Sequence, residues 1–194
     1  MVALYTPQVD KNVIAHDFSL KSTDGNLYSL SSYHKGNGLL IMFICNHCPY
    51  VKAIINNLVY DVNTLKNDYN IYTIAIMPND TIAYPDDSYE NMIKFAQEYG
   101  INFPYLIDED QTVAKNYGAV CTPDFFGFNN KLELCYRGRF DSSGKNQVDS
   151  KQEDRDLFNA MKFISKTGKA PDNQKPSIGC SIKWKSQDDQ FVPH

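Results

Sequence analysis

The stretch LLIMFICNHCPYVKAI, residues 39–54, begins as a continuous apolar run and then passes through two cysteines into a helical pattern. An apolar run without alternation is typical of a central strand that is buried on both faces. After the cysteines, apolar residues recur at helical spacing. They are Val51, Ile54, Ile55, Leu58, Val59, Val62 and Leu65. A second buried strand over residues 71–77 completes a strand–helix–strand unit, which predicts two parallel strands with a right-handed crossover.

Shorter elements continue this alternation of strands and helices. Residues 17–30 form two short segments around Asp24-Gly25, a turn signal that predicts an N-terminal β-hairpin. The other predicted elements are a helix over 90–99, a strand over 105–107, a helix over 112–117, a hairpin of 125–128 with 132–139, and a closing helix around 157–164. The order of elements therefore predicts an α/β fold.

The chain becomes polar and rich in proline, asparagine and lysine from Thr167 onward, except for SIGCSIKW at 177–184. We expect an irregular extension there, docked through Ile178, Ile182 and Trp184. The predicted boundaries are one domain over residues 1–168 and a C-terminal extension over 169–194 that packs on it.

Composition and charge narrow the classes of function. A chain of 194 residues with 42% hydrophobic residues can bury one sizeable core. The net charge is only −4 and no basic cluster occurs, which argues against nucleic acid and anionic membranes as partners. No apolar run reaches the roughly 20 residues of a transmembrane helix, and the N-terminus lacks a leader pattern, so we expect a cytoplasmic protein. Five cysteines, an odd number, do not suit a secreted disulfide framework.

The two cysteines of Cys45-Asn46-His47-Cys48 stand where the buried strand gives way to its helix. Open α/β sheets place their sites at the carboxyl ends of strands. A helix N-terminus also offers unpaired N–H groups and the positive end of the helix dipole. Such positions lower a cysteine pKa from about 8.5 to about 3.5–7.5, which makes the thiol a nucleophile at neutral pH. The motif is therefore a candidate redox pair, half of a metal site, or two buried thiols.

Four features of the chain together resemble the thioredoxin superfamily. They are Asp17-Phe18-Ser19-Leu20, the Asp24-Gly25 turn, the LLIMFI strand ending in C-x-x-C, and Thr122-Pro123 before a strand. More narrowly, the chain resembles the redoxin branch that includes alkyl hydroperoxide reductase/thiol-specific antioxidant proteins, and CNHCPY with GCSIKW is similar to its peroxiredoxin-like members. The resemblance spans roughly residues 12–184. It implies a thioredoxin fold with a central mixed sheet, helices on both faces, an N-terminal β-hairpin and a C-terminal extension.

The resemblance implies thiol–disulfide exchange as the first of two mechanisms. Cys45 would attack a partner disulfide, and Cys48 would release the partner by forming Cys45–Cys48. Pro123 would face the pair through a cis peptide bond, and His47 would help to stabilise the thiolate. Two features of thioredoxins are missing, namely a proline between the cysteines and an acidic residue on the preceding strand.

The second mechanism that the resemblance implies is peroxide reduction. Cys48-Pro49 matches the cysteine–proline pair of peroxiredoxins, with Cys45 in the position of their hydroxyl residue. Cys48 would become a sulfenic acid that Cys45 or Cys180 resolves as a disulfide. The candidates for the arginine that faces the peroxide in that pattern are Arg137 and Arg139.

A third hypothesis is binding of Cu(I) or Zn²⁺ without turnover, with Cys45, His47 and Cys48 as ligands. Candidates for a further ligand are Cys121, Cys180 and His194. A structural zinc site usually has a second well-spaced pair of cysteines, and the sequence has none, so we expect neither a metal nor a cofactor.

Other residues have simpler interpretations. Cys135 alternates with its neighbours in a predicted strand, and both it and Cys121 are expected to pack in the core. Asp86 and Asp87 are expected to be solvated or helix-capping carboxylates.

We therefore predict an enzyme, a cytoplasmic antioxidant thiol–disulfide oxidoreductase. Its predicted catalytic residues are Cys45, His47, Cys48 and Pro123. Its predicted supporting residues are Thr122, Pro49 and Cys180. The expected partner is a protein or small-molecule disulfide or thiol, with thioredoxin, glutathione and peroxide as candidates.

Overall fold

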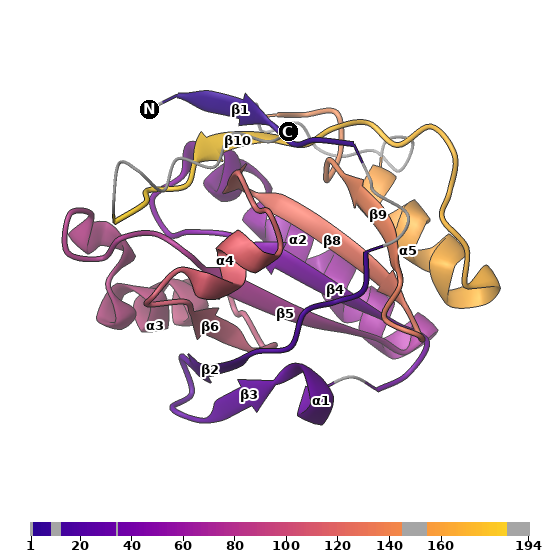
Figure 1. The fold of residues 1–194 in the computed structure, drawn as a ribbon, viewed down its shortest axis with the longest axis horizontal. Coiled ribbons are helices and arrows are strands. Elements are labelled where there is room, and N and C mark those ends of the chain that lie inside the picture. Colours follow the sequence, from indigo (N-terminus) through magenta and orange to yellow (C-terminus); the bar gives the residue numbers. More distant parts are fainter. Residues whose placement is uncertain (1, 9–12, 34, 145–154, 186–194) are drawn as a thin grey trace.

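The computed structural model describes residues 2–8, 13–33, 35–144 and 155–185. Its centre is a seven-stranded mixed sheet, ordered β3-β2-β6-β5-β4-β8-β9 (Figure 1). The strands are β2 (Ser19–Ser22), β3 (Leu27–Ser29), β4 (Gly38–Phe43), β5 (Ile71–Met77), β6 (Tyr105–Ile107), β8 (Asp124–Asn129) and β9 (Leu134–Gly138). Strands β4, β5 and β6 are parallel neighbours, whereas β8 pairs antiparallel with β4.

Helices cover both faces of this sheet, as predicted. They are α1 (Leu30–Tyr33), α2 (Pro49–Tyr69), α3 (Tyr89–Glu98), α4 (Thr112–Asn116) and α5 (Asp156–Thr167), with a 3-10 turn over Pro85–Asp87. The side chains of β4 alternate between two apolar clusters, one packed under α2, α3 and α5 and the other under α1 and α4. Strand β4 is therefore buried on both faces, which is why its sequence is apolar without a break.

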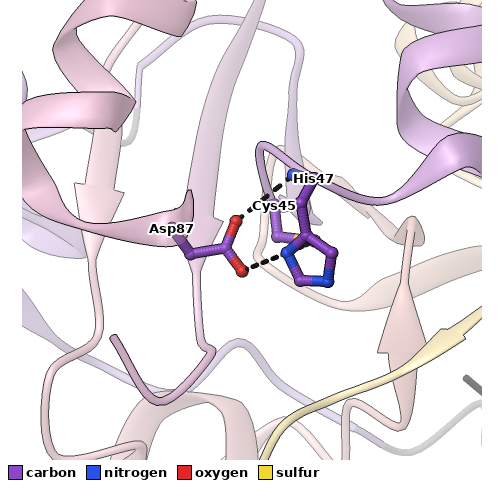
Figure 2. Close-up of side chains that lie close together, drawn as sticks. All are labelled: Cys45, His47 and Asp87. Carbon is purple, nitrogen blue, oxygen red and sulfur yellow. Dashed lines mark hydrogen bonds and ion pairs between the residues drawn. The ribbon is translucent and has the colours of Figure 1, made fainter. Parts of the chain in front are cut away.

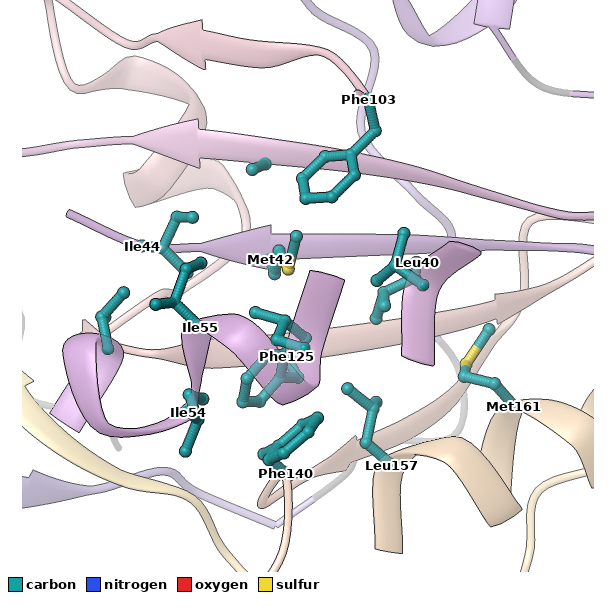
Figure 3. Close-up of a cluster of buried hydrophobic side chains, with 14 of the residues drawn as sticks. Leu40, Met42, Ile44, Ile54, Ile55, Phe103, Phe125, Phe140, Leu157 and Met161 are labelled. Carbon is teal, nitrogen blue, oxygen red and sulfur yellow. The ribbon is translucent and has the colours of Figure 1, made fainter. Parts of the chain in front are cut away.

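Helix α2 lies on the sheet face that Leu40, Met42 and Ile44 cover (Figure 3). Its residues Ile54 and Ile55 point into this cluster. Each fully buried side chain of this kind contributes about 1.5–3 kcal/mol relative to exposure, so the packing fixes the position of the helix on β4. The segment between β4 and α2, which carries the cysteines, is therefore held at both of its ends.

A second, three-stranded sheet has the order β1-β10-β7, with β1 (Ala3–Tyr5), β7 (Cys121–Thr122) and β10 (Ile178–Ser181). It lies along the upper edge of the molecule in Figure 1. The expectation of an irregular C-terminal extension was wrong for 178–181, because the backbone of β10 pairs with two strands that are distant in sequence. Of the expected docking residues, Ile182 is buried, and Trp184 packs against the sheet face under α4.

The other predicted elements are confirmed, with shifts of at most three residues at their ends. The hairpin around Asp24-Gly25 is β2–β3, and Gly25 has the left-handed φ of 85° that its turn requires. The boundary between residues 168 and 169 stays a prediction. Among the described residues, no helix is both long enough and apolar enough to cross a membrane.

Candidate active site

The two cysteines of the motif lie at the junction of β4 and α2, as predicted. Cys48 is the N-cap residue of α2, with an extended backbone at φ −66° and ψ 123°, and Pro49 occupies the first helical position. Proline suits this position because its missing N–H would find no partner inside the helix anyway. The sulfur of Cys48 therefore sits at the positive end of a 21-residue helix.

The peptide bond between Thr122 and Pro123 is cis, as the resemblance implied. It faces the motif: the Sγ of Cys45 lies 3.2 Å from Oγ1 of Thr122, and the Sγ of Cys48 lies 3.1 Å from the carbonyl oxygen of Thr122. The structure thus brings together Cys45, Cys48, Thr122 and Pro123, which come from two segments more than 70 residues apart.

A third thiol joins this group from the C-terminal strand. The Sγ of Cys180 lies 3.1 Å from the Sγ of Cys48. Cys180 faces Thr122 across the β10–β7 ladder, so the strand pairing itself brings this thiol to the site. We call Cys45, Cys48 and Cys180 the thiol cluster; all three are buried, with exposed fractions of 0%, 0% and 3%.

The electrostatics of the thiol cluster favour a thiolate at Cys48. Hydrogen bonding from Cys45 lowers the pKa of Cys48 most, burial opposes this, and Cys180 and backbone N–H groups lower the pKa further. The same hydrogen bond, followed by burial, raises the pKa of Cys45. Burial and the neighbouring Cys48 raise the pKa of Cys180 to about 12. The directions of these pKa shifts place the negative charge of the thiol cluster on Cys48 and leave Cys45 and Cys180 as neutral thiols beside it.

His47 pairs with a buried carboxylate that the sequence did not reveal (Figure 2). Its Nδ1 lies 2.6 Å from Oδ2 of Asp87, and this hydrogen bond raises the pKa of His47. Burial raises the pKa of Asp87, but its hydrogen bonds to His47 and Asn79 outweigh burial and leave the pKa lowered. Asp87 was expected to be a solvated or helix-capping carboxylate; instead it is buried, with an exposed fraction of 0%, and pairs with His47, whereas Asp86 is exposed, as expected.

Asp87 also holds the backbone of the motif. Its Oδ1 accepts hydrogen bonds from the N–H groups of Asn46 at 2.9 Å and His47 at 3.3 Å. The side chain of Asn46 accepts a hydrogen bond from the hydroxyl of Tyr105 at 2.9 Å. The two residues between the cysteines are thus fixed by partners from outside the motif, and no periodicity or motif in the sequence signals these partners.

The remaining predicted residues lie apart from this chemistry. Cys121 is buried and its Sγ contacts the carbonyl oxygen of Pro123 at 3.6 Å, while Cys135 lies on β9 with its Sγ 3.8 Å from the carbonyl oxygen of Gly168. Arg137 forms a buried ion pair with Asp124, and Arg139 pairs with Asp156.

Among the described residues, one group of side chains could hold a metal ion. It consists of Cys45, His47 and Asp87, whose possible ligand atoms all lie within 4.8 Å of one another. They offer one sulfur, one nitrogen and one oxygen, a mixed set that suits Zn²⁺. This set differs from the one expected from sequence, in which Cys48 was a ligand. His194 lies outside the described residues, and metal binding stays a hypothesis.

The fold and the paired thiols at a helix N-terminus define a thiol-dependent oxidoreductase of the thioredoxin type. The chain belongs to the AhpC/TSA family, whose pattern matches residues 12–142. This match covers β2 to the loop after β9 and so includes both cysteines of the motif.

Comparison with solved structures agrees with this assignment. An uncharacterized conserved protein from Geobacillus kaustophilus is 42% identical, with a TM-score of 0.85 over 96% of this chain and 98% of that chain. A hypothetical protein from Sinorhizobium meliloti 1021 is 35% identical, with a TM-score of 0.84 over 94% and 98%. The peroxidoxin BcpB from Mycobacterium tuberculosis shares the fold at 16% identity, with a TM-score of 0.55 over 66% and 84%. The comparison with curated proteins gave no match.

Proposed function

We propose that this member of the AhpC/TSA family catalyses thiol–disulfide exchange through a redox-active disulfide between Cys45 and Cys48. The observation that carries the proposal is the position of Cys45 and Cys48 at a helix N-terminus and against the cis proline, and the lowered pKa of Cys48 supports it. The substrate class is a protein or small-molecule disulfide. Thioredoxin or glutathione as electron donor, and a cytoplasmic location, are parts of the same proposal.

The reaction proceeds in two exchange steps. The thiolate of Cys48 attacks one sulfur of the partner disulfide, so that a mixed disulfide forms and the partner's other sulfur leaves as a thiolate. Cys45 then loses its proton and attacks Cys48, which forms Cys45–Cys48 and releases the partner's first sulfur. The partner disulfide gains two electrons and the cysteine pair loses two.

This order reverses the one expected from sequence, where Cys45 attacks first. The basis for this order is the place of Cys48 as the N-cap of α2 together with its lowered pKa. His47 lies 4.0 Å from the Sγ of Cys45 and carries a raised pKa, which suits it to stabilise the thiolate that later forms there.

Access is part of the proposal, because the side chains of Cys45 and Cys48 are fully buried. A partner disulfide reaches them only when a covering segment moves. Cys48 contacts Thr122 of β7 and Cys180 of β10, and β10 is a four-residue strand whose backbone pairs with β1 and β7. We propose that β10 is the segment that opens, because its pairing involves only four residues.

Peroxide reduction by Cys48 is the second candidate, and the observation that favours it is the ionised Cys48-Pro49 pair. The arginines weigh against it. The chain has three, and each is bound to a carboxylate: Arg137 to Asp124, Arg139 to Asp156 and Arg155 to Asp61. None of these ion pairs leaves a guanidinium facing the sulfur of Cys48, so the peroxide lacks the charged partner that the peroxiredoxin pattern supplies.

The deciding experiment compares oxidised glutathione and hydrogen peroxide as oxidants of the reduced chain, with loss of the Cys48 thiol followed by mass spectrometry. We expect loss with oxidised glutathione to exceed that of free cysteine by at least about 10-fold, as a lowered thiol pKa allows. Faster loss with peroxide but not with the disulfide would replace exchange by peroxide reduction.

Turnover of insulin disulfides tests the assignment of the pair. Cys48→Ser and Cys45→Ser should each lower turnover by about 1,000-fold or more, because residues that act as one catalytic unit fail together. Cys135→Ser, which removes a buried thiol outside the cluster, is the matched control and should change turnover less than about 2-fold. Normal turnover in Cys48→Ser or Cys45→Ser would contradict the proposal.

A further inference from the structure

The thiol cluster contains one cysteine more than a two-cysteine exchange requires. Cys48 is its central member, since hydrogen bonds link its sulfur to both Cys45 and Cys180. Cys180 lies outside the matched family region of residues 12–142, so the family match assigns it nothing. Its place beside the nucleophile therefore needs an explanation from the structure itself.

Strand β10 is fitted closely to the cis-proline segment. Cys180 pairs with Thr122 and Ser181 with Cys121 in an antiparallel ladder. On one side of the ladder the hydroxyl of Ser177 donates a hydrogen bond to the carbonyl oxygen of Pro123 at 2.9 Å. On the other side, the N–H of Ile182 donates to the carbonyl oxygen of Val120 at 3.2 Å. The strand is thus held on both sides of Cys180.

Gly179 makes this fit possible. A Cβ added at this position would lie well inside contact distance of the carbonyl group of Thr122 and of the nitrogen of Pro123. Because those atoms belong to backbone in a buried ladder, they cannot move aside as a flexible side chain would. A residue without a side chain next to Cys180 is therefore needed for β10 to lie on the backbone beside the cis bond.

The opposite edge of β10 is closed as well, since Ala3 of β1 pairs with Cys180. Cys180 has an exposed fraction of 3%, so its thiol is in contact with Cys48 and is shielded from reagents in solution. A buried cysteine is often only a small packing residue. Here the ladder also places the sulfur of Cys180 3.1 Å from that of Cys48, the proposed nucleophile.

We propose that β10 is an internal partner strand and that Cys180 is a third catalytic thiol, which exchanges with Cys45 for the disulfide bond to Cys48. This inference rests on the proposed function, in which Cys48 is the attacking thiolate. Cys180 takes the position that the thiol of an external partner would take. The oxidised site then holds one disulfide with two alternative partners for Cys48.

The step is a thiol–disulfide exchange without net oxidation. Starting from Cys45–Cys48, the deprotonated sulfur of Cys180 attacks the sulfur of Cys48. The bond between Cys48 and Cys180 forms, the bond between Cys45 and Cys48 breaks, and the proton lost by Cys180 is balanced by the one that Cys45 takes up. Once Cys48 is in a disulfide it carries no charge, so the thiolate that helps to raise the pKa of Cys180 is gone and attack becomes easier. The oxidising equivalents come from the partner disulfide.

The decisive test uses full-length Cys45→Ser, in which Cys48 can pair only with a thiol outside the motif. The reduced protein is treated with one equivalent of oxidised glutathione, quenched with acid, alkylated under denaturing conditions and mapped by mass spectrometry. We expect Cys48–Cys180 as the main product. The double variant Cys45→Ser/Cys180→Ser should instead accumulate glutathione on Cys48, and Cys45→Ser/Cys135→Ser is the matched control that should behave as Cys45→Ser.

The outcomes separate this inference from the proposed function. A glutathione adduct that persists on Cys48 of Cys45→Ser as long as in the double variant would overturn the role of Cys180 while leaving Cys48 as nucleophile. A Cys48 thiol that fails to react in either variant would overturn the proposed function itself. The wild-type chain, oxidised in the same way, should contain both disulfides, and finding Cys45–Cys48 alone would contradict the exchange.

Gly179→Ala tests the role of the strand without removing a thiol. In a Cys45→Ser background it should shift β10 from β7 and slow formation of Cys48–Cys180 by at least about 10-fold, as expected when reacting atoms lose their alignment. The first attack on glutathione should be unchanged or faster. Thermal unfolding checks that the variant is folded. An unchanged rate of Cys48–Cys180 disulfide formation would show that the close fit of β10 has no part in the exchange.

Discussion

The surroundings of Cys48 and of Cys135 show how differently one fold treats the same side chain. Both are buried free thiols. Cys48 lies at a helix N-terminus between two other thiols, and these contacts lower its pKa despite burial. Cys135 is the second residue of β9, where burial is the largest influence and raises its pKa.

This difference separates burial from reactivity. Burial disfavours the charged form of any thiol, so on its own it makes a cysteine inert. The helix N-terminus and the neighbouring donors reverse that effect at Cys48 only. A reactive thiol in this fold is therefore recognised by its donors and not by its exposure.

The largest expected effect concerns the link between the strand that carries Cys135 and the cis-proline segment beside Cys48. Arg137, two residues after Cys135, forms a buried ion pair with Asp124, the residue after Pro123. Arg137→Met should lower the free energy of unfolding by about 3 kcal/mol or more, because it leaves a buried carboxylate without its partner. Urea unfolding measures the effect.

The control is Arg139→Met, which removes a partly exposed pair with Asp156, whose side chains have exposed fractions of 23% and 31%. Its loss of unfolding free energy should stay below about 1 kcal/mol. Equal losses in the two variants would mean that the Arg137–Asp124 pair does not tie β9 to the start of β8.

The pH dependence of alkylation sharpens the comparison directly. Because the pKa of Cys48 is lowered, its rate with iodoacetamide should change little between pH 6 and pH 8. A thiol with an ordinary or raised pKa reacts about 10-fold faster for each pH unit in this range, so Cys135 should speed up about 100-fold. Peptide mapping gives both rates in one sample.

The slope, and not the rate, carries this result, since burial slows both thiols. Conformational opening divides out when each thiol is compared with itself at another pH. If the alkylation rate of Cys48 rose tenfold per pH unit, Cys48 would not be ionised at neutral pH, which would contradict the proposed function.

Asp87→Asn is the mildest test of the surroundings of Cys48. Loss of the carboxylate should lower the pKa of His47 by about one unit, because an opposite charge in contact favours the imidazolium. Titration of the imidazole by NMR measures this. Asp86→Asn, at the exposed neighbouring position, is the control and should leave the titration of His47 in place.

Stability should follow the same pair. The lowered pKa of Asp87 stabilises the fold above pH about 4, the ordinary pKa of an aspartate, and this stabilisation is lost as pH falls through the folded pKa. The raised pKa of His47 stabilises the fold below pH about 6.5, and that stabilisation is lost as pH rises through the folded pKa. The difference in unfolding free energy between wild type and Asp87→Asn should therefore be largest between about pH 4 and 6.5. A difference that grows above pH 8 would contradict the pairing.

Local patterns were enough to predict most of the central sheet. Strand β4 and helix α2 follow from an apolar run and from helical spacing, which depend on residues near in sequence. Both cysteines could be placed for the same reason, whereas the cis bond at Pro123 was expected only from the family resemblance.

The features that could not be predicted from the sequence depend on partners that are distant along the chain. Strands β1 and β10 are three and four residues long, too short for a periodic signal, and exist because β10 pairs with both β1 and β7. Asp87 lies among turn residues in the sequence, which suggests a solvated side chain. In the fold it is hydrogen-bonded to His47 and Asn79. Long-range pairing of this kind leaves no mark on the local sequence pattern.

The pairing of Ala3 with Cys180 also bears on the order of folding. Contacts between residues so far apart close a large loop, and such loops close late because their entropy cost precedes any gain. The adjacent strands β4 and β5, joined by α2, close a much shorter one. We therefore expect the folding chain to hold Cys45 and Cys48 in place before Cys180 arrives, so that the two-thiol site forms first and the three-thiol site is completed later.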